Sequence, residues 1–345
     1  MDIKRLEEEY VASVNDKLSV SNSRLNLFRR CHRAHYYKYC WNIVPKRKGE
    51  ALERGSAIHA CLEAYYKGKS WKKEWKKFRD KWEAEHLSEE KELLGDIPQM
   101  VYDLMENYIQ CYEVEEEDMD YLETELHFQV PLAEGIELEG YIDYIARDDK
   151  GIVIGETKTH KVFPNNDVRL FNAQSSIYAW VLNEKLSMYE EPIKRIVWNY
   201  IKAKQPTEPQ VLKNGKLSTK KIDSTPYTVS KTIKRLGLDE KDYADLISAQ
   251  SYDNYFRRHE LRINKGVMNS IVEDTISTAK QIKNNPLLKD RNLGKDCSFC
   301  DYRGICQAEL IDPDADLSYI LKVDYEERGK RDAEEDSKKV RRNRK

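Results

Sequence analysis

Two short apolar runs rich in Ile, Val and Tyr occupy residues 140–158, and a polar segment with turn-forming residues separates them. This pattern predicts a β-hairpin. If Asp149 and Lys150 form the centre of the turn, strand geometry sets Asp143 directly opposite Glu156. The predicted hairpin therefore carries two facing carboxylates.

The two carboxylates share one face of the predicted hairpin with Lys158, because side chains alternate faces with a period of two. Two facing carboxylates repel each other and weaken a hairpin. A divalent cation such as Mg²⁺ or Mn²⁺ between them reverses that effect, because hard cations bind carboxylate oxygens. An acid that points into solvent at a sheet edge gives the same pattern, so the hairpin alone leaves both interpretations open.

Helical spacing of apolar residues dominates the chain before the hairpin, and both helical and alternating patterns follow it. Helices are predicted over residues 21–37, 51–66, 67–90, 97–112, 167–186 and 252–284. Strands are predicted at residues 124–130 and 193–202, in addition to the hairpin. This order of elements predicts an α/β fold in which helices pack on a small mixed sheet.

Two of these helices carry a polar residue on their apolar stripe. His59 shares a stripe with Leu52, Leu62 and Tyr66, where a lone histidine is usually a core residue. Gln174 interrupts the stripe of the helix that follows the hairpin, and a buried glutamine needs a polar partner. Both residues are therefore candidates for something other than packing.

The remaining segments are more polar. Residues 205–248 are rich in turns and locally basic, which indicates an insertion or lid rather than a second core. Residues 1–20 form a polar N-terminal segment, and residues 311–345 form a charged tail that we expect to be disordered. The expected main domain thus spans residues 21–310, with its core at 121–203.

Composition adds little to this assignment. The 345 residues are 40% hydrophobic, which is enough for a core, and 59 basic against 61 acidic residues give a net charge of -2. That balance argues neither for nor against binding to nucleic acid. No apolar run approaches the length of a membrane span, and the first residues do not resemble a secretory signal, so we expect a cytoplasmic protein that does not contact a membrane.

Three of the seven cysteines, Cys297, Cys300 and Cys306, lie within ten residues of one another. An odd number of cysteines in a chain expected to be cytoplasmic argues against a disulfide framework. A four-coordinate site needs one more thiolate, for which Cys31 is the best candidate and Cys40 the next. Thiolates at this spacing suit Zn²⁺ or an iron–sulfur cluster, and buried free cysteines are the remaining alternative.

Taken together, the motifs resemble those of the PD-(D/E)XK nucleases in their RecB-like form. The cysteines are similar to the split set that holds a [4Fe–4S] cluster in the AddB nuclease domain and in CRISPR-associated RecB-like exonucleases. The resemblance covers about residues 21–309, and departures from the pattern are His32, where that family often has proline, and the 205–248 insertion. The matching motifs, in chain order, are Ser21-x-Ser23-Arg-Leu-x-x-Phe28-x-x-Cys31, Gly55-Ser-Ala-Ile-His59, Gly140-x-x-Asp143, Glu156-x-Lys158, Gln174-x-x-x-Tyr178, and Cys297, Cys300 and Cys306.

The resemblance implies a restriction-endonuclease-like core and a metal-dependent nuclease that hydrolyses phosphodiester bonds in DNA. It implies that His59, Asp143, Glu156 and the carbonyl of Thr157 hold Mg²⁺ or Mn²⁺. It also implies catalytic roles for Asp143, Glu156, Lys158, Gln174 and Tyr178, and a [4Fe–4S] cluster bound by Cys31, Cys297, Cys300 and Cys306.

The expected activity is an exonuclease on single strands or DNA ends in recombination, repair or replication. No G-x-x-x-x-G-K-[ST] motif is present, so a helicase–nuclease fusion is not expected. A stand-alone nuclease of phage or mobile-element type, with a recombination or replication partner, is the expected setting. Two alternatives are a DNA-binding iron–sulfur scaffold with weak catalysis and a zinc-stapled metal-dependent hydrolase.

Overall fold

The computed structural model describes residues 2–47, 49–164 and 172–328, apart from the side chains of residues 93 and 114–117. The chain forms two compact units, each assembled from separate segments. The predicted hairpin site lies in the central unit, and the predicted cysteine ligands lie in the terminal unit. We define the terminal unit as Met1–Lys48, Phe128–Gly140 and Asn269–Lys345, and the central unit as Gly49–His127 and Tyr141–Met268.

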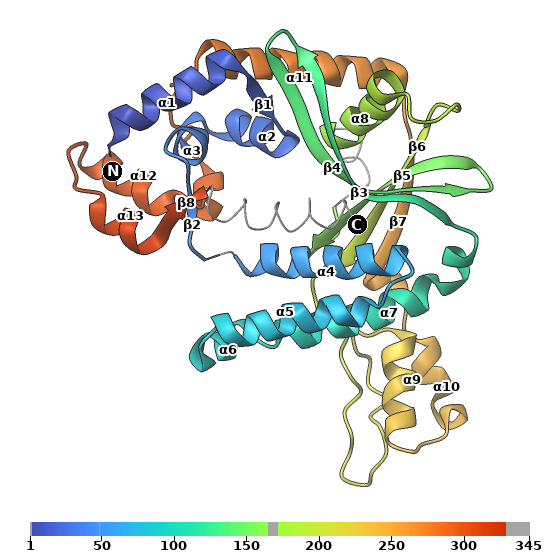
Figure 1. Ribbon diagram of the computed structural model, residues 1–345. Helices are drawn as coiled ribbons and strands as arrows, with labels where there is room; N and C mark the ends of the chain where they lie inside the picture. Colours follow the sequence, from blue (N-terminus) through green and yellow to red (C-terminus); the bar gives the residue numbers. More distant parts are fainter. Residues whose placement is uncertain (1, 48, 165–171, 329–345) are drawn as a thin grey trace. The chain divides into compact units, whose positions relative to one another are not determined.

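A mixed sheet runs through the fold (Figure 1). Its strands are β1 (Leu18–Val20), β3 (Asp120–Ala133), β4 (Ile136–Asp148), β5 (Gly151–His160), β6 (Arg195–Lys202) and β7 (Phe256–Arg262). The order is β1-β4-β5-β6-β7, with β3 paired to β4. The β1–β4 and β5–β6 pairs are parallel, and β4–β5 and β6–β7 are antiparallel. This sheet with its helices confirms the predicted mixed α/β class.

The β4–β5 hairpin has the register that a turn at Asp149 and Lys150 requires. Ile145 pairs with Ile154, and the ladder continues to Tyr144 opposite Gly155. The turn is closed by the backbone N–H of Lys150, which donates to Asp148 Oδ1 over 2.9 Å, and Gly151 follows with a φ of 101°. Glycine suits that position because it adopts positive φ without steric cost.

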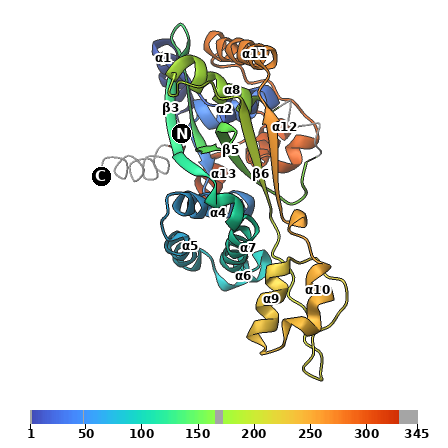
Figure 2. The same ribbon diagram turned by 90° about the vertical axis from the view of Figure 1, so that its right-hand side faces the viewer.

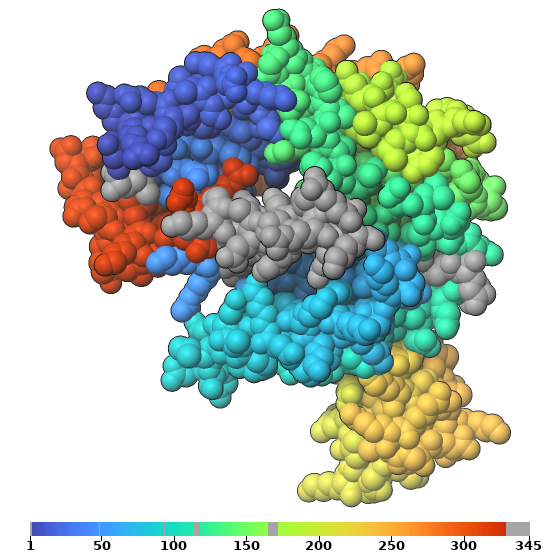
Figure 3. All heavy atoms as spheres, viewed as in Figure 1, coloured from blue at the N-terminus to red at the C-terminus, as the bar shows by residue number. Residues whose placement is uncertain are grey.

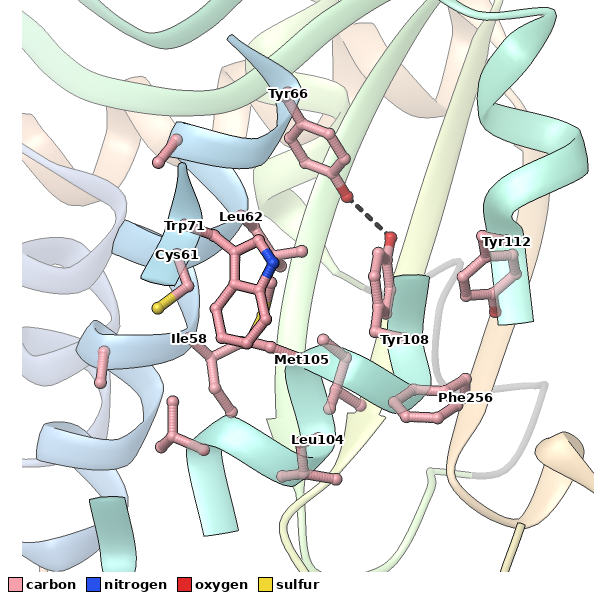
Figure 4. Packing of buried hydrophobic residues seen from close by; sticks show 14 of the residues in the cluster. Ile58, Cys61, Leu62, Tyr66, Trp71, Leu104, Met105, Tyr108, Tyr112 and Phe256 are labelled. Atoms are coloured by element: carbon pink, nitrogen blue, oxygen red, sulfur yellow. Dashed lines mark hydrogen bonds between the residues drawn. The ribbon is translucent and has the colours of Figure 1, made fainter. Parts of the chain in front are cut away.

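The central unit surrounds its strands with helices and π-helical or 3₁₀ turns. Ile58, Cys61 and Leu62 pack against Leu104 and Met105 in an apolar cluster of this unit (Figure 4). Burying each such side chain contributes about 1.5–3 kcal/mol relative to exposure. The elements are α4 (Glu50–Tyr66), α5 (Trp71–Glu85), α6 (Ser88–Leu94), α7 (Ile97–Glu117), α8 (Ala173–Trp180), η3 (Val181–Leu186), α9 (Pro226–Arg235), η4 (Glu240–Tyr243), α10 (Ala244–Ser248) and η5 (Tyr252–Asn254).

The predicted insertion carries α9 and α10, which pack against each other (Figure 2). Its surface is the yellow part of Figure 3. The segment has a small apolar cluster of its own. The buried members are Leu217, Val229, Ile233, Tyr243 and Leu246.

The terminal unit is mainly helical. Ser21 caps α2, since its side chain accepts a hydrogen bond from the backbone N–H of Arg24. An aromatic cluster that includes Tyr37, Trp41 and Tyr302 forms its core. Its further elements are α1 (Ile3–Asp16), α2 (Asn22–Arg30), α3 (His32–His35), η1 (Tyr36–Cys40), β2 (Ile43–Pro45), most of α11 (Lys265–Asn284), η6 (Lys295–Phe299), α12 (Arg303–Ile311), α13 (Ser318–Asp324) and β8 (Tyr325–Glu327).

Several boundaries differ from the sequence-based expectation. The helix predicted over residues 252–284 is wrong in its first third, where β7 pairs antiparallel with β6 before α11 begins. The alternation of Phe256, Arg258 and Glu260 with their neighbours is short and highly charged, so helical periodicity farther along the segment obscured it. The polar N-terminal segment likewise contains β1, an edge strand of only three residues.

The C-terminal tail begins later than expected. Within residues 311–328 the chain forms α13 and then β8, which pairs antiparallel with β2. The rest of the predicted disordered tail, residues 329–345, lies outside the described residues. Across the described ranges, no helix has the length and apolar character needed to cross a membrane.

Candidate functional site

The hairpin and two helices of the central unit bring the predicted site residues together. Asp143 lies on β4, and Glu156, Thr157 and Lys158 are consecutive on β5. His59 comes from α4, and Gln174 and Tyr178 come from successive turns of α8. The contacts described below connect all seven of these residues.

Asp143 is held at both of its carboxylate oxygens. The backbone N–H of Thr157 donates to Oδ2 over 2.6 Å. On the other oxygen, His59 Nδ1 lies 3.5 Å from Oδ1. The carboxylate therefore has a fixed orientation between β5 and α4, as a metal ligand requires.

Glu156 is only 1% exposed, and its two oxygens differ in their surroundings. Oε1 accepts hydrogen bonds from Lys158 Nζ and, over 2.8 Å, from Gln174 Nε2. Oε2 is buried and has no hydrogen-bond partner among the described residues. Burial, followed by the nearby charge of Asp143, raises the pKa of Glu156 to about 7, although Lys158 acts in the opposite direction.

The hydrogen bonds of Gln174 account for the presence of a polar residue on the apolar stripe of α8. Besides Glu156, its Nε2 donates to the hydroxyl of Tyr178 over 2.7 Å, and that hydroxyl donates to the backbone carbonyl of Tyr141. Asn172 caps α8 and fixes the start of the helix, since Oδ1 accepts from the backbone N–H of Gln174. The amide nitrogen of Gln174 thus has two polar partners, and it orients Glu156.

His59 lies at the site rather than within the apolar core. Its side chain is 28% exposed, and Leu52, which was expected on the same buried stripe, is 59% exposed. Burial lowers the pKa of His59, but the charge and hydrogen bond of Asp143 outweigh that effect and raise the pKa overall. The ring of His59 therefore interacts with the carboxylate of Asp143.

Glu125 is a site residue that the sequence did not single out. One ligand atom each from His59, Glu125 and Asp143 lie within 4.8 Å of one another. Glu125 has a φ of 51°, a left-handed conformation that is uncommon for a residue other than glycine. The alternating pattern of β3 placed Glu125 on a polar face, but nothing in that pattern distinguished it from His127 or Gln129.

This set of donors fits a divalent cation. Carboxylate oxygens are preferred by Mg²⁺ and Mn²⁺, and imidazole is an accepted ligand of transition ions. The unpartnered Oε2 of Glu156 adds a buried oxygen that needs a positive partner. His59, Glu125, Asp143 and Glu156 are therefore the side chains that could hold such an ion.

A second polar network anchors the opposite face of β5. Asn199 pairs with Thr157 across the β5–β6 ladder, and its Nδ2 lies 3.3 Å from Thr157 Oγ1. The same amide donates over 2.9 Å to the hydroxyl of Tyr108, which also receives a hydrogen bond from Arg258. Tyr66 completes the network through a 2.7 Å contact with Tyr108 (Figure 4). These buried bonds hold the Thr157 peptide from behind the site.

The four predicted cysteine ligands line one cavity of about 230 Å³ in the terminal unit. Cys31 reaches it from between α2 and α3, and Cys297, Cys300 and Cys306 reach it from η6 and α12. Cys40 is buried in the aromatic core and does not line this cavity. The structure thus brings together Cys31 and three cysteines from the far end of the sequence.

The cavity has a basic lining. Arg30, Arg33, Arg291 and Arg303 contribute to it, with Asp296 as the acidic member. Burial raises the pKa of the Cys300 thiol, and the charge of Arg30 opposes this shift. Cationic side chains near a set of thiols favour their ionised, metal-binding form.

We expect the stability of the metal-free protein to fall as the pH rises from about 4.5 to about 7. Over this interval folded Glu156 binds more protons than the unfolded chain, so raising the pH favours unfolding by a few kcal/mol at most. The raised pKa of His59 acts in the same direction near neutrality. Thermal melting in chelator at several pH values measures the effect.

Two controls accompany that measurement. Glu156→Gln should flatten the pH dependence, because the amide does not titrate. Saturating Mg²⁺ should stabilise the protein more at pH 7 than at pH 5, because a cation favours the ionised carboxylates. A pH profile that is the same in wild type and Glu156→Gln would contradict the raised pKa.

Comparison with known proteins matches residues 19–307 to the family model of the PD-(D/E)XK nuclease superfamily. Two solved structures have similar chains. The crystal structure of SSO0001 is 13% identical, with a TM-score of 0.33, over 88% of this chain and 93% of that chain. A protein from Eubacterium rectale named "Putative exonuclease" is 11% identical, with a TM-score of 0.46, over 85% and 91% of the two chains. No curated protein matches the sequence.

Proposed function

Because the chain belongs to the PD-(D/E)XK nuclease superfamily, we propose that it is a divalent-metal-dependent exonuclease that hydrolyses phosphodiester bonds in DNA. The observation that supports this most strongly is the arrangement of Asp143, Glu156 and Lys158. Two carboxylates and one ammonium group lie together on one face of the hairpin. This combination can bind a cation and also meet the negative charge of a phosphate.

In this proposal His59, Asp143, Glu156 and the carbonyl of Thr157 hold Mg²⁺ or Mn²⁺, and the geometry adds Glu125 to the set. The ion, when bound, supplies Lewis-acid chemistry at the scissile phosphate. The protein's part is to fix the donors before the substrate arrives. The Thr157 N–H orients Asp143, and Gln174 orients Glu156.

Lys158 serves in the proposed mechanism as the positive group beside the reacting phosphate. Its Nζ contacts Glu156 Oε1, so it can hold a water molecule near that carboxylate and offset negative charge as it develops. Tyr178 and Gln174 line the same site, and their hydrogen bonds to Tyr141 and Glu156 keep both side chains in place. Together they complete the proposed catalytic set.

We propose that Cys31, Cys297, Cys300 and Cys306 hold a [4Fe–4S] cluster with a structural role. Thiolates bind such clusters in sets of four, and these four cysteines line one cavity. Among the described residues, His59, Glu125 and Asp143 form the group whose ligand atoms gather within 4.8 Å, and the cysteines are more widely spread. A [4Fe–4S] cluster takes its thiolates on different irons, so it accepts ligands that do not converge on a single point.

An exonuclease is favoured over a sequence-specific endonuclease by the chemistry of the site. Carboxylates, an ammonium group and an amide address the phosphodiester backbone, and backbone contacts carry no sequence information. In this proposal the protein acts on single strands or DNA ends, as a nuclease of phage or mobile-element type. Its setting would be recombination, repair or replication, with a partner protein from that process.

End-labelled single- and double-stranded DNA, incubated with Mg²⁺ or Mn²⁺, tests the proposal. We expect label to be released progressively as short products, and we expect chelator to abolish release, because the carboxylates alone cannot activate the phosphate. A covalently closed circular substrate is the control. Rapid cleavage of the circle would replace the exonuclease with an endonuclease, and binding without any cleavage would favour a DNA-binding iron–sulfur scaffold.

A further inference from the structure

The catalytic face of the sheet continues past Lys158 toward the end of β5. His160 follows two residues later and lies on the same face. Across the sheet, Lys158 on β5 pairs with Tyr200 on β6, and Tyr200 pairs with Arg257 on β7. Strands β5, β6 and β7 are neighbours in the sheet (Figure 1). Within the central unit, a row of side chains on one face therefore crosses them directly beside the candidate metal site.

Tyr200 is the centre of an aromatic cluster on this face. Tyr200 is 4% exposed, so its buried ring forms the base of the cluster. The rings of His160 and Phe163 lie 5.5 and 6.3 Å from its ring, measured between centroids, and that of His259 lies at 5.8 Å. Phe163 is half-buried just after the strand, beside Val162, which is 81% exposed. The buried ring of Tyr200 thus packs against aromatic side chains that are partly exposed at the surface.

Arg257 adds a positive charge to this cluster. Its guanidinium carbon lies 4.9 Å from the centroid of the Phe163 ring. Its Nε donates to the backbone carbonyl of Asp253, and no carboxylate pairs with it in the described part of the chain. By contrast, Lys202 and Lys204, farther along β6 and just beyond it, are both paired with Asp223. The cation beside Phe163 is left available to an anion.

We propose that His160, Phe163 and Arg257 form a subsite for one nucleotide of a single-stranded DNA segment next to the scissile phosphate. The inference rests on the proposed nuclease function. An aromatic ring with an arginine beside it is the combination that binds single strands, because the base stacks on the ring and the cation meets the phosphate. Lys161 is exposed next to the subsite and adds positive charge along the same path.

The subsite selects unpaired over paired DNA. A base within a duplex is stacked on its neighbours on both faces and cannot lie on Phe163 unless it is unstacked first. Stacking is tolerant of sequence, since every base has an aromatic face. The nucleotide bound here would therefore be held by shape and charge, with little preference for which base it carries.

A fluorescence experiment tests the subsite separately from catalysis. Oligonucleotides that carry one 2-aminopurine at successive positions are titrated into Glu156→Gln protein, in which cleavage is removed. We expect quenching at one position, and we expect Phe163→Leu in the same background to abolish it. Affinity for single strands should fall roughly 5- to 100-fold, as expected for the loss of one stacked base. Phe163→Trp should restore both signals, and Arg257→Gln should weaken binding with a smaller salt dependence.

Two comparisons make the result decisive. Tyr319→Leu removes an exposed aromatic ring of the terminal unit and should change neither quenching nor affinity. With Glu156 restored, Phe163→Leu should lose more activity on single-stranded DNA than on bis(p-nitrophenyl) phosphate, because the small diester extends over fewer contacts than a strand does. Unchanged quenching and affinity in Phe163→Leu would overturn the subsite. If wild type hydrolysed neither DNA nor the small diester, the nuclease proposal would fail, while loss of binding in Phe163→Leu would still support a single-strand site.

Discussion

Glu156→Gln is expected to lower the rate of DNA cleavage roughly a thousandfold or more, with the fold intact. The carboxylate is buried beside Asp143 and presents an oxygen that has no partner among the described residues, and in the proposed site that oxygen binds the cation. Losing a ligand that supplies several kcal/mol of transition-state stabilisation corresponds to that change in rate. Asp143→Asn and Lys158→Ala should have comparable effects, measured as initial rates at matched metal concentration.

Stability measurements separate this loss of activity from unfolding. In chelator, Glu156→Gln should melt at or above the wild-type temperature, because the substitution removes the repulsion between two neighbouring carboxylates. Asp149→Asn is the matched control, since Asp149 is an exposed acid in the turn of the same hairpin. His59→Gln should weaken metal binding about tenfold or more with a smaller effect on melting. Wild-type rates in the Asp143, Glu156 and Lys158 variants would show that the site is misassigned.

Cys31→Ala is expected to cost the iron–sulfur cluster as completely as Cys300→Ala. All four ligands are needed, and Cys31 is the one that connects the N-terminal helices to the C-terminal loop. Losing the cross-link between residues 31 and 297 should also lower the free energy of unfolding by roughly 5 kcal/mol, on the chain-entropy scale for a closed loop of this length. Anaerobic analysis of iron, sulfide and zinc, together with thermal melting, measures both effects.

Cys40→Ala is the control for the cysteine series. Its thiol is buried in the aromatic core of the terminal unit, so its loss should leave the cluster in place and cost only about 1 kcal/mol through a small cavity. Stoichiometric zinc without iron in the wild type would replace the cluster with a zinc site. A cluster that survives Cys31→Ala would mean that another residue is the fourth ligand.

The hairpin was predictable because its information is local. A turn of two residues sets the register, and the period of two then places Glu156 and Lys158 on one face without reference to the rest of the chain. Gln174 was noticeable for a related reason, since a polar residue on an apolar stripe stands out within its own helix. Its partners, Glu156 and Tyr178, account for it in the structure.

The residues that the sequence did not reveal depend on distant parts of the chain. Glu125 differs from other acids on a polar strand face only through the approach of His59 and through its left-handed backbone. Phe163 becomes notable only when β6 and β7 place Tyr200 and Arg257 beside it. Strand β7 itself was missed because pairing with β6, rather than a strong local pattern, makes that segment a strand.

The discontinuous terminal unit has a consequence for the order of events during synthesis. Cys31 leaves the ribosome 266 residues before Cys297, counted as 297 minus 31. At a synthesis rate of about 5–20 residues per second, Cys31 is synthesised roughly 15–50 s before Cys297. The last segment of the central unit, which ends at Met268, emerges before any of the three C-terminal cysteines. Translation would thus deliver the hairpin acids first and the closing thiols last, so the proposed cluster can assemble only after the whole central unit has been synthesised.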